Sequence, residues 1–200
     1  KKRKLANAEE IFQQDLGECY WIPEGGAGPL GIEGATALGE VIATQSYEKM
    51  RNQKVYVFHA CGTGSSLAGV VSGVAKCGAQ NVKVLGVNVL KGYSALKQEI
   101  LEQIPIDYRQ SIEWDVIGDF HCGGYAKFPD YLASFLTSFE SETGVPLDPV
   151  YTCKVVWAIS QLAASGDLSG VDTVLMVHSG GLQGRRGYGL PFPDVSFPLQ

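Results

Sequence analysis

Cys61-Gly62-Thr63-Gly64-Ser65-Ser66-Leu67-Ala68-Gly69 is the stretch of this chain that decides its fold. The run before it, residues 55–60, is short, apolar and rich in β-branched and aromatic side chains, which predicts a buried strand of a parallel sheet. The run after it, residues 67–76, is rich in Ala, Val and Gly and follows two hydroxyl residues. It predicts a helix that begins near Ser65 or Ser66.

The turn between these two elements has the chemistry of an anion-binding site. Its glycines let backbone N–H groups point inward, and a helix N-terminus adds unpaired donors and partial positive charge at the same point. Thr63, Ser65 and Ser66 add hydroxyls, and no lysine lies in the loop to act as in an ATP-binding P-loop. An ordinary strand-to-helix turn can have the same composition, so the wider sequence has to separate the two interpretations.

Composition excludes several classes of function. The chain has 200 residues, 45% of them hydrophobic, and a formal net charge of −5, so it lacks the broad positive charge that nucleic acid attracts. Its one dense basic run, residues 1–4, is expected to be a solvated surface segment. No apolar stretch of about 18 residues and no signal-peptide pattern is present, so we expect neither membrane insertion nor secretion.

The cysteines and histidines give no sign of a metal site. The five cysteines include no CxxC pair and are expected to be free thiols in a reducing compartment, which favours a cytoplasmic protein. The three histidines have no metal-ligand spacing with the cysteines or with each other.

Strand-like and helix-like runs alternate along the chain. After an opening helix through about Gln14, strands are expected at 19–22, 55–60, 82–89, 112–117 and 174–178. Helices are expected at 31–50, 65–76, 94–103, 129–142 and 153–164, and the tail after Tyr188 is expected to be a surface loop. With no internal repeat or linker, residues 1–200 are predicted to form a single α/β domain with a doubly wound, mainly parallel sheet and helices on both faces.

Glycine-rich breaks follow four of the expected strands, at 25–28, 62–64, 123–124 and 180–181. In such a sheet these breaks gather at one edge, where ligands bind. Glycines that merely end strands would account for each break separately. They would not account for the functional side chains beside the breaks, which are Thr63, Ser66, Tyr125, Tyr151 and Ser179. We therefore predict a small-molecule site at this edge.

Four segments together resemble one enzyme family. They are Ile22-Pro23-Glu24-Gly25-Gly26, residues 61–69, Leu147-Asp148-Pro149-Val150-Tyr151-Thr152 and His178-Ser179-Gly180-Gly181. Their order and spacing are similar to those of the 1-aminocyclopropane-1-carboxylate (ACC) deaminase and D-cysteine desulfhydrase family, and residues 123–127 look like its active-site loop. The resemblance implies the large domain of the tryptophan-synthase β-like fold, pyridoxal 5′-phosphate as cofactor, a small amino acid as substrate and a homodimer.

The resemblance also implies roles for individual residues. It assigns the cofactor's phosphate to Gly62, Thr63, Gly64, Ser65 and Ser66. Tyr151 would lie against the pyridoxal ring and Tyr125 would face the reacting carbon of the substrate. Thr152 and Ser179 would be the candidates to meet the ring nitrogen with a neutral hydroxyl. Each tyrosine could instead be a wall residue whose hydroxyl is satisfied by the backbone.

Thr152 and Ser179 also bear on the substrate. In the family, ACC deaminases carry Glu and Leu at these two positions, whereas the desulfhydrase branch carries small hydroxyl residues. A hydroxyl at the ring makes a weaker electron sink than a buried glutamate, which suffices for β-elimination of a good leaving group. The sequence thus favours D-cysteine desulfhydration to pyruvate, ammonia and sulfide over ACC deamination, which stays the alternative.

A pyridoxal-phosphate enzyme needs a lysine for its Schiff base, and no family-like lysine motif is found. Lys1, Lys2 and Lys4 lie too close to Pro23 and are expected on the surface, while Lys127 and Lys154 match other family positions. We therefore expect the carboxy-terminal portion of a longer enzyme, without its upstream part and smaller domain and inactive alone. A noncatalytic phosphate-ligand or cofactor-binding relative is the other alternative; a sulfhydrylase of the same fold agrees less well with residues 148–151.

Overall fold

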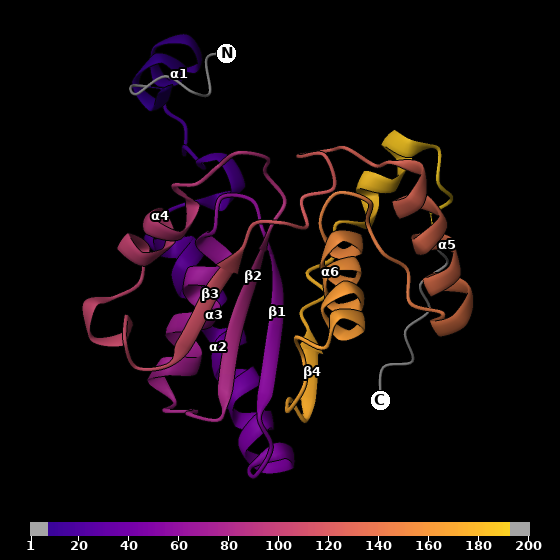
Figure 1. The fold of residues 1–200 in the computed structure, drawn as a ribbon. Coiled ribbons are helices and arrows are strands. Elements are labelled where there is room, and N and C mark those ends of the chain that lie inside the picture. Colours follow the sequence, from indigo (N-terminus) through magenta and orange to yellow (C-terminus); the bar gives the residue numbers. More distant parts are fainter. Residues whose placement is uncertain (1–7, 193–200) are drawn as a thin grey trace.

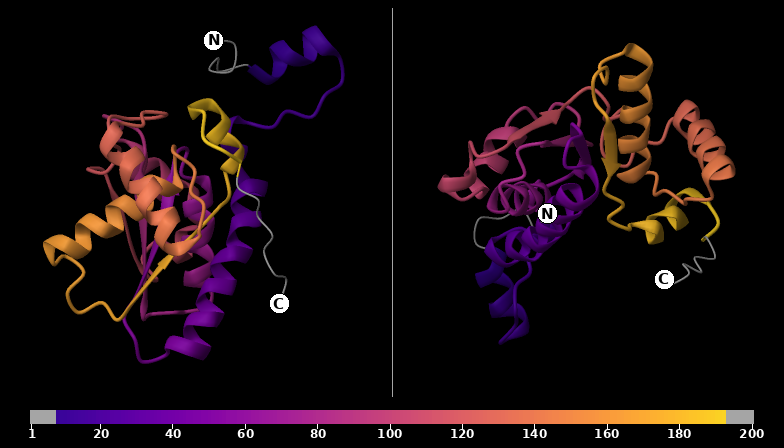
Figure 2. Two further views of the ribbon diagram at one scale, coloured as in Figure 1. Left: turned by 90° about the vertical axis from the view of Figure 1, so that its right-hand side faces the viewer. Right: turned by 90° about the horizontal axis from the view of Figure 1, so that it is seen from below.

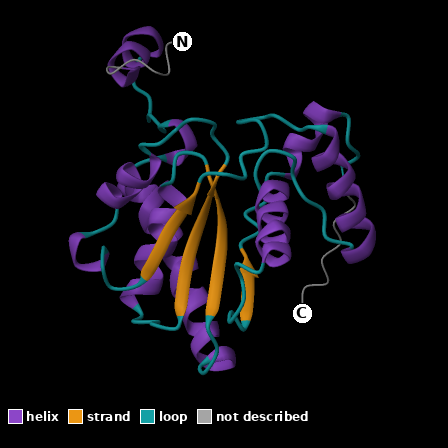
Figure 3. Cartoon of the chain, viewed as in Figure 1, coloured by secondary structure: helices purple, strands orange, loops and turns teal. Residues whose placement is uncertain are grey.

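Four parallel strands form the sheet, in the order β3-β2-β1-β4. The computed structural model describes residues 8–192 (Figure 3). The strands are β1 (Val55–Cys61), β2 (Val82–Asn88), β3 (Glu113–Ile117) and β4 (Thr173–Met176). The α-helices are α1 (Ala8–Leu16), α2 (Pro29–Met50), α3 (Ser65–Lys76), α4 (Leu96–Gln103), α5 (Asp130–Thr143) and α6 (Thr152–Ser165). Short 3-10 turns are η2 (Glu24–Gly26), η3 (Ile106–Tyr108) and η4 (Leu182–Tyr188).

The strand order places a topological switch point beside β1. From β1 the chain moves outward to β2 and β3 and then returns to β4 on the other side of β1 (Figure 1). Connections on the two sides of β1 diverge and leave a crevice beyond its carboxyl end, where open α/β sheets bind ligands. The predicted doubly wound parallel sheet is confirmed, and Cys61, at the end of β1, leads directly into the glycine-rich turn.

Helices cover both faces of the sheet (Figure 2). On one face, α2, α3 and α4 enclose a core that includes Val57 of β1, Val84 of β2 and Val70 of α3. On the other face, α6 packs against Phe58, and α5 packs in turn against α6 through Leu132 and Leu136. The central strands β1 and β2 are buried on both sides, which explains why their sequences are mostly apolar rather than alternating, whereas the edge strands β3 and β4 are only partly buried.

Glycines let α2 and α3 approach unusually closely. A Cβ on Gly73 would collide with the carbonyl oxygen of Thr36 and lie 2.7 Å from the backbone nitrogen of Glu40. A Cβ on Gly69 would lie 2.6 Å from the carbonyl oxygen of Ile32. Because the obstacles are backbone atoms of α2, no side-chain rearrangement could relieve them.

The element prediction was wrong at one place. Residues 19–22 do not form a strand, and Tyr20 and Ile22 are largely exposed. Among residues 8–192 no neighbouring strand pairs with this segment, so its backbone groups cannot join a ladder. The segment instead joins α1 to η2, and Trp21 stacks on Phe12 at 5.1 Å between ring centroids.

The other elements were predicted to within three residues at each end where a boundary was stated. The basic run 1–4 and the tail after residue 192 lie outside the described residues. Within residues 8–192, no helix combines the length and apolar character needed to cross a membrane.

The close approach of α2 and α3 predicts opposite effects for two glycine-to-alanine substitutions. Gly73→Ala should lower the free energy of unfolding by about 1–3 kcal/mol, because α3 has to move away from α2. Gly34→Ala should raise it by roughly 0.5–1 kcal/mol, because Gly34 lies within α2 with nothing within 4 Å of an added Cβ. Urea unfolding of both variants measures the difference, and equal effects would contradict the packing described.

Candidate functional site: a phosphate-type cradle and two tyrosines

An open cleft of about 2100 Å³ lies beyond the carboxyl end of β1. Its walls come from segments far apart in the sequence, and they include three of the four glycine-rich breaks. The wall includes Gly25, His59, Gly62, Thr63, Gly64, Ser66, Tyr125, Tyr151, Ser179 and Gly181. The predicted gathering at one edge therefore holds for three of the four breaks, of which residues 25–28 reach the cleft without a preceding strand, whereas Gly123 and Gly124 do not line it.

The turn at residues 62–66, here called the cradle, has the geometry of an anion site. Gly64 adopts φ +83°, and a Cβ there would lie 2.8 Å from Ile100 Cδ1, so only glycine fits. The first helical bond of α3 runs from the Ala68 N–H to the Gly64 carbonyl at 2.9 Å. The amides of Ser65, Ser66 and Leu67 precede that bond and have no acceptor within the helix, which leaves them for a ligand.

Only two of the three cradle hydroxyls face the cleft. Thr63 and Ser66 are exposed and line it. Ser65 is buried, and its hydroxyl donates to Gln103 Oε1 at 2.9 Å, so this side chain fastens α3 to α4. Ser65 can therefore offer an anion its backbone N–H but not its hydroxyl.

Tyr151 lies over the cradle, with Tyr125 beside it. A Cβ on Gly62 would lie 3.6 Å from the Tyr151 hydroxyl oxygen, and the rings of Tyr151 and Tyr125 meet edge to face at 6.1 Å. Burial, and after it the interaction with the Tyr125 side chain, raises the pKa of the Tyr151 hydroxyl. Tyr151 therefore keeps its proton at neutral pH, while Tyr125 is 56% exposed at the mouth of the cleft.

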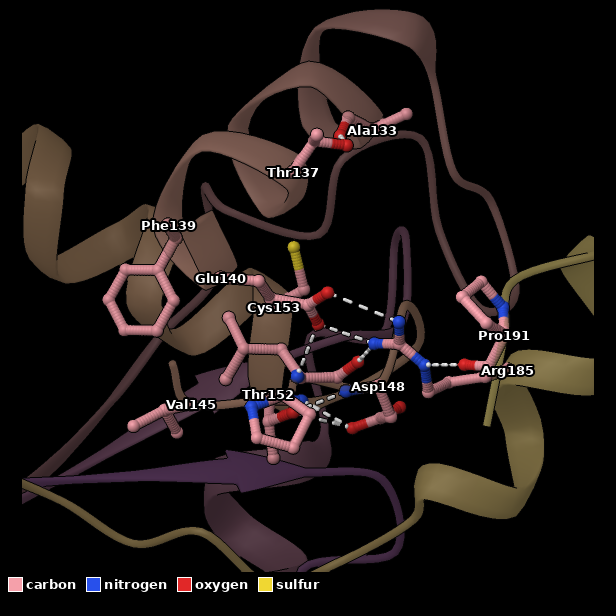
Figure 4. Close-up of polar contacts among 12 residues, drawn as sticks. Ala133, Thr137, Phe139, Glu140, Val145, Asp148, Thr152, Cys153, Arg185 and Pro191 are labelled. Carbon is pink, nitrogen blue, oxygen red and sulfur yellow. Dashed lines mark hydrogen bonds and ion pairs between the residues drawn. The ribbon is translucent and has the colours of Figure 1, made fainter. Parts of the chain in front are cut away.

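Thr152 lies elsewhere than predicted. It is fully buried, and its hydroxyl donates to Asp148 Oδ2 at 2.9 Å and accepts from the Asp148 N–H at 2.8 Å. It is not among the residues that line the cleft. The Asp148 carboxylate also accepts the N–H groups of Val150, Tyr151 and Thr152 and so holds the start of α6; Figure 4 draws its contacts with Thr152. Of the two predicted hydroxyls, Ser179 alone lies on the cleft wall.

Ser179 lies in a loop held close to the Asp148 turn. His178 Nδ1 accepts from the Gly180 N–H at 3.3 Å, so its Nε2 carries the proton and donates to the Pro146 carbonyl at 2.7 Å. Gly181 has φ +82°, and a Cβ there would lie 3.3 Å from Asp148 Cγ. The loop with Ser179 and the turn with Tyr151 therefore pack directly on each other.

His59 is a wall residue that sequence reasoning did not single out. It lies in β1, lines the cleft and is only 2% exposed, and neither ring nitrogen has a hydrogen-bond partner among the described residues. Burial lowers the pKa of His59 to about 4, so the imidazole is neutral at physiological pH. A histidine within an otherwise apolar strand was the available signal.

Lys154 supports the loop that carries Tyr125. This lysine is completely buried in α6, and its ammonium donates to the Gly124 carbonyl at 2.7 Å. Burial lowers the pKa of Lys154. Lys127 is exposed and absent from the cleft wall, which instead includes Lys91 and Lys76, the latter paired with Glu40 at 2.6 Å.

Amides, two hydroxyls and a positive helix end, with an aromatic ring above them, suit a phosphate-bearing ligand with a flat ring. Within the described part of the chain, no group of three or more acidic, histidine or cysteine side chains could hold a metal ion. Fold and site together define a class of parallel α/β protein with a phosphate-type cradle at the switch point.

Comparison with known proteins identifies the family within this class. Residues 2–180 match the family model described as pyridoxal-phosphate dependent enzyme, and the chain belongs to this family. The predicted fold and the resemblance to ACC deaminases and D-cysteine desulfhydrases are confirmed. The crystal structure of an ACC deaminase homologue superimposes with a TM-score of 0.73 at 28% identity, covering 91% of this chain and 56% of that one.

Both predicted reactions occur among the names of the curated relatives. A Pyrococcus abyssi protein, provisionally named as an ACC deaminase, is 31% identical over 191 residues, which are 91% of this chain and 56% of that protein. D-cysteine desulfhydrase of Salmonella newport is 29% identical over 170 residues, which are 81% of this chain and 50% of that protein. The comparisons therefore support the alternative, ACC deamination, better than the favoured desulfhydration. The chain spans about half the length of these relatives.

The buried His59 predicts a pH dependence of stability. Its pKa is about 4 in the folded chain and ordinarily near 6.5, so below pH 6.5 the unfolded chain binds a proton that the folded chain does not. Stability should therefore fall as the pH falls from 6.5 to 4, by up to about 3 kcal/mol from this residue, with no contribution above pH 6.5.

Urea unfolding at pH 7.5 and pH 4.5 measures this contribution. His59→Leu should lose less stability between the two pH values than the unmodified chain, by about 2–3 kcal/mol. The measurement at pH 7.5 is the internal control, because it isolates any change in packing. An identical loss in both proteins would show that His59 is not the titrating group.

Proposed function

We propose that the protein to which this chain belongs is a pyridoxal-phosphate-dependent deaminase or lyase that acts on a small amino acid. The observation that carries the proposal is the cradle at the switch point with Tyr151 directly above it. The family supplies the cofactor's identity. Its phosphate would be held by the amides of Ser65, Ser66 and Leu67 and by the hydroxyls of Thr63 and Ser66.

Bound pyridoxal phosphate supplies an electron sink for bonds broken at the amino acid's α-carbon. Tyr151 would border the ring, and Ser179 would be the neutral hydroxyl available to the ring nitrogen. Because its pKa is raised, Tyr151 keeps the proton on its hydroxyl oxygen and would present a hydrogen-bond donor rather than a negative charge. Tyr125, at the cleft mouth, would face the substrate.

Between the two reactions, we propose ACC deamination first. It is supported by the names of relatives that cover 91% of this chain at 30–31% identity. One of the two hydroxyls that favoured desulfhydration is Thr152, which is engaged with Asp148 and does not line the cleft. Ser179 still supports D-cysteine as the second candidate substrate, because a hydroxyl there suits the easier β-elimination.

The Schiff-base lysine would come from a part of the protein outside this chain. The described lysines closest to the predicted motifs, Lys127 and Lys154, are respectively exposed and used to hold the Gly124 carbonyl. We therefore propose that this chain supplies the phosphate site and one wall, without turnover of its own. An incomplete single domain, a cytoplasmic location and a homodimer remain predictions.

Replacing Ser66 should test the cradle. Ser66→Phe in the complete protein should weaken pyridoxal-phosphate binding at least about tenfold, because it removes a hydroxyl from a charged ligand and fills the cradle. Equilibrium titration followed by tryptophan fluorescence measures the affinity. Ser138→Phe is the matched control, since Ser138 is an exposed serine of α5 away from the cleft. Equal affinities of the two variants would make the cradle an ordinary turn.

Product analysis should separate the substrates. With the complete protein and cofactor, ACC should yield ammonia and a four-carbon 2-oxo acid, about tenfold or more faster than D-cysteine yields ammonia, pyruvate and sulfide. Faster sulfide release would establish desulfhydration instead. Cofactor binding with neither product would identify a noncatalytic relative, and no cofactor binding at all would overturn the proposal.

A further inference from the structure

We propose that Arg185 and Glu140 are positioning residues that fasten the Tyr151 turn and the Ser179 loop to each other. Arg185 comes from η4 and Glu140 from α5, and neither lines the cleft. The role given to Tyr151 and Ser179 rests on the proposed function, whereas the fastening itself is a property of the fold. We call the Arg185–Glu140 pair the clamp.

The clamp binds both backbone polar groups of Leu147, its N–H and its carbonyl. The guanidinium of Arg185 forms two hydrogen bonds with the Glu140 carboxylate, one of them 3.1 Å long, and donates to the Leu147 carbonyl at 2.6 Å (Figure 4). Glu140 in turn accepts the Leu147 N–H at 2.8 Å. Arg185 Nε donates to the Pro191 carbonyl at 2.9 Å. The position of Leu147 is thus fixed from both sides of its backbone.

From Leu147 the restraint passes to Tyr151 through the next residue. Asp148 is 1% exposed, and its carboxylate accepts the Tyr151 N–H at 2.8 Å and the Thr152 N–H at 2.7 Å. The start of α6 therefore takes its position from the Asp148 side chain. Because Leu147 and Asp148 are consecutive, a shift of the first moves the carboxylate that holds Tyr151.

The same turn holds the Ser179 loop. Gly181 packs on the Asp148 carboxylate, and His178 donates to Pro146. Arg185 follows four residues after Gly181 and closes the loop back onto Leu147. Three contacts, at residues 146, 147 and 148, thus join the two cleft segments that face the cofactor side.

The charges in the clamp argue for positioning rather than for simple stability. Arg185 is 3% exposed and the Glu140 side chain 22% exposed, and apolar residues in such places are often at least as stabilising as an ion pair. One arginine side chain here binds three separate residues, Glu140, Leu147 and Pro191, which an apolar side chain cannot do. Lysine would keep the charge but could not reproduce the forked guanidinium.

Hydrogen exchange of the complete protein, without cofactor or substrate, tests the fastening. Arg185→Met should speed amide exchange at least about fivefold both in residues 147–152 and in residues 178–182, while β2 exchanges as before. Arg185→Lys and Glu140→Gln should have the same effect to a smaller degree, and they decide the question if Arg185→Met does not fold. Faster exchange in only one of the two segments would overturn the proposal.

Kinetics test the positioning. Arg185→Lys should lower kcat about tenfold to a hundredfold with little change in KM, because small displacements of Tyr151 affect the reacting geometry. Val82→Ala, which makes a cavity at the amino end of β2, is the control for lost stability. If both variants lose the same thermal stability and the same kcat, the clamp is structural only. Absence of cofactor binding in the unmodified protein would refute the proposed function, and the exchange result would still decide the fastening.

Discussion

The close backbone contact between α2 and α3, which glycines make possible, is the constraint on which the rest of the structure depends. Gly39, Gly69 and Gly73 leave the two helix backbones in contact, so α3 lies in a fixed position between α2 and the sheet. That position sets where the N-terminus of α3 points, and hence where the amides after Gly64 gather. A displaced α3 would separate the cradle from Tyr151, which reaches it from the opposite face of the sheet.

The second organising element is the Asp148 turn, which serves two parts of the site at once. A carboxylate taken from water needs several donors, and here three backbone amides and one hydroxyl supply them. An added Cβ at residue 181 would lie 3.3 Å from the same carboxylate and the backbone there has φ +82°, which together explain the glycine. One buried acid therefore determines both the start of α6 and the path of the Ser179 loop.

Prediction from sequence succeeded where one local pattern determines the outcome. The glycine-rich turn, the strand before it and the helix from Ser65 to Lys76 follow from composition and spacing alone. It failed where a partner elsewhere decides. Residues 19–22 have strand propensity but no strand beside them, and the hydroxyls of Ser65 and Thr152 bind Gln103 and Asp148 rather than facing the cleft. His59 was overlooked although it lies in the predicted buried strand, because only the packing shows that neither ring nitrogen has a partner among the described residues.

By itself, the sequence determined the class of fold, the cradle and the likeness to pyridoxal-phosphate enzymes, because apolar runs, glycine positions and the order of motifs can be read directly along the chain. Only the tertiary structure decided which hydroxyls reach the cleft, that Tyr151 lies over Gly62, and that Arg185 and Glu140 join two distant segments. These outcomes depend on the packing of elements separated by tens of residues. Their hydrogen-bond partners are chosen by proximity in space, which no short stretch of sequence specifies.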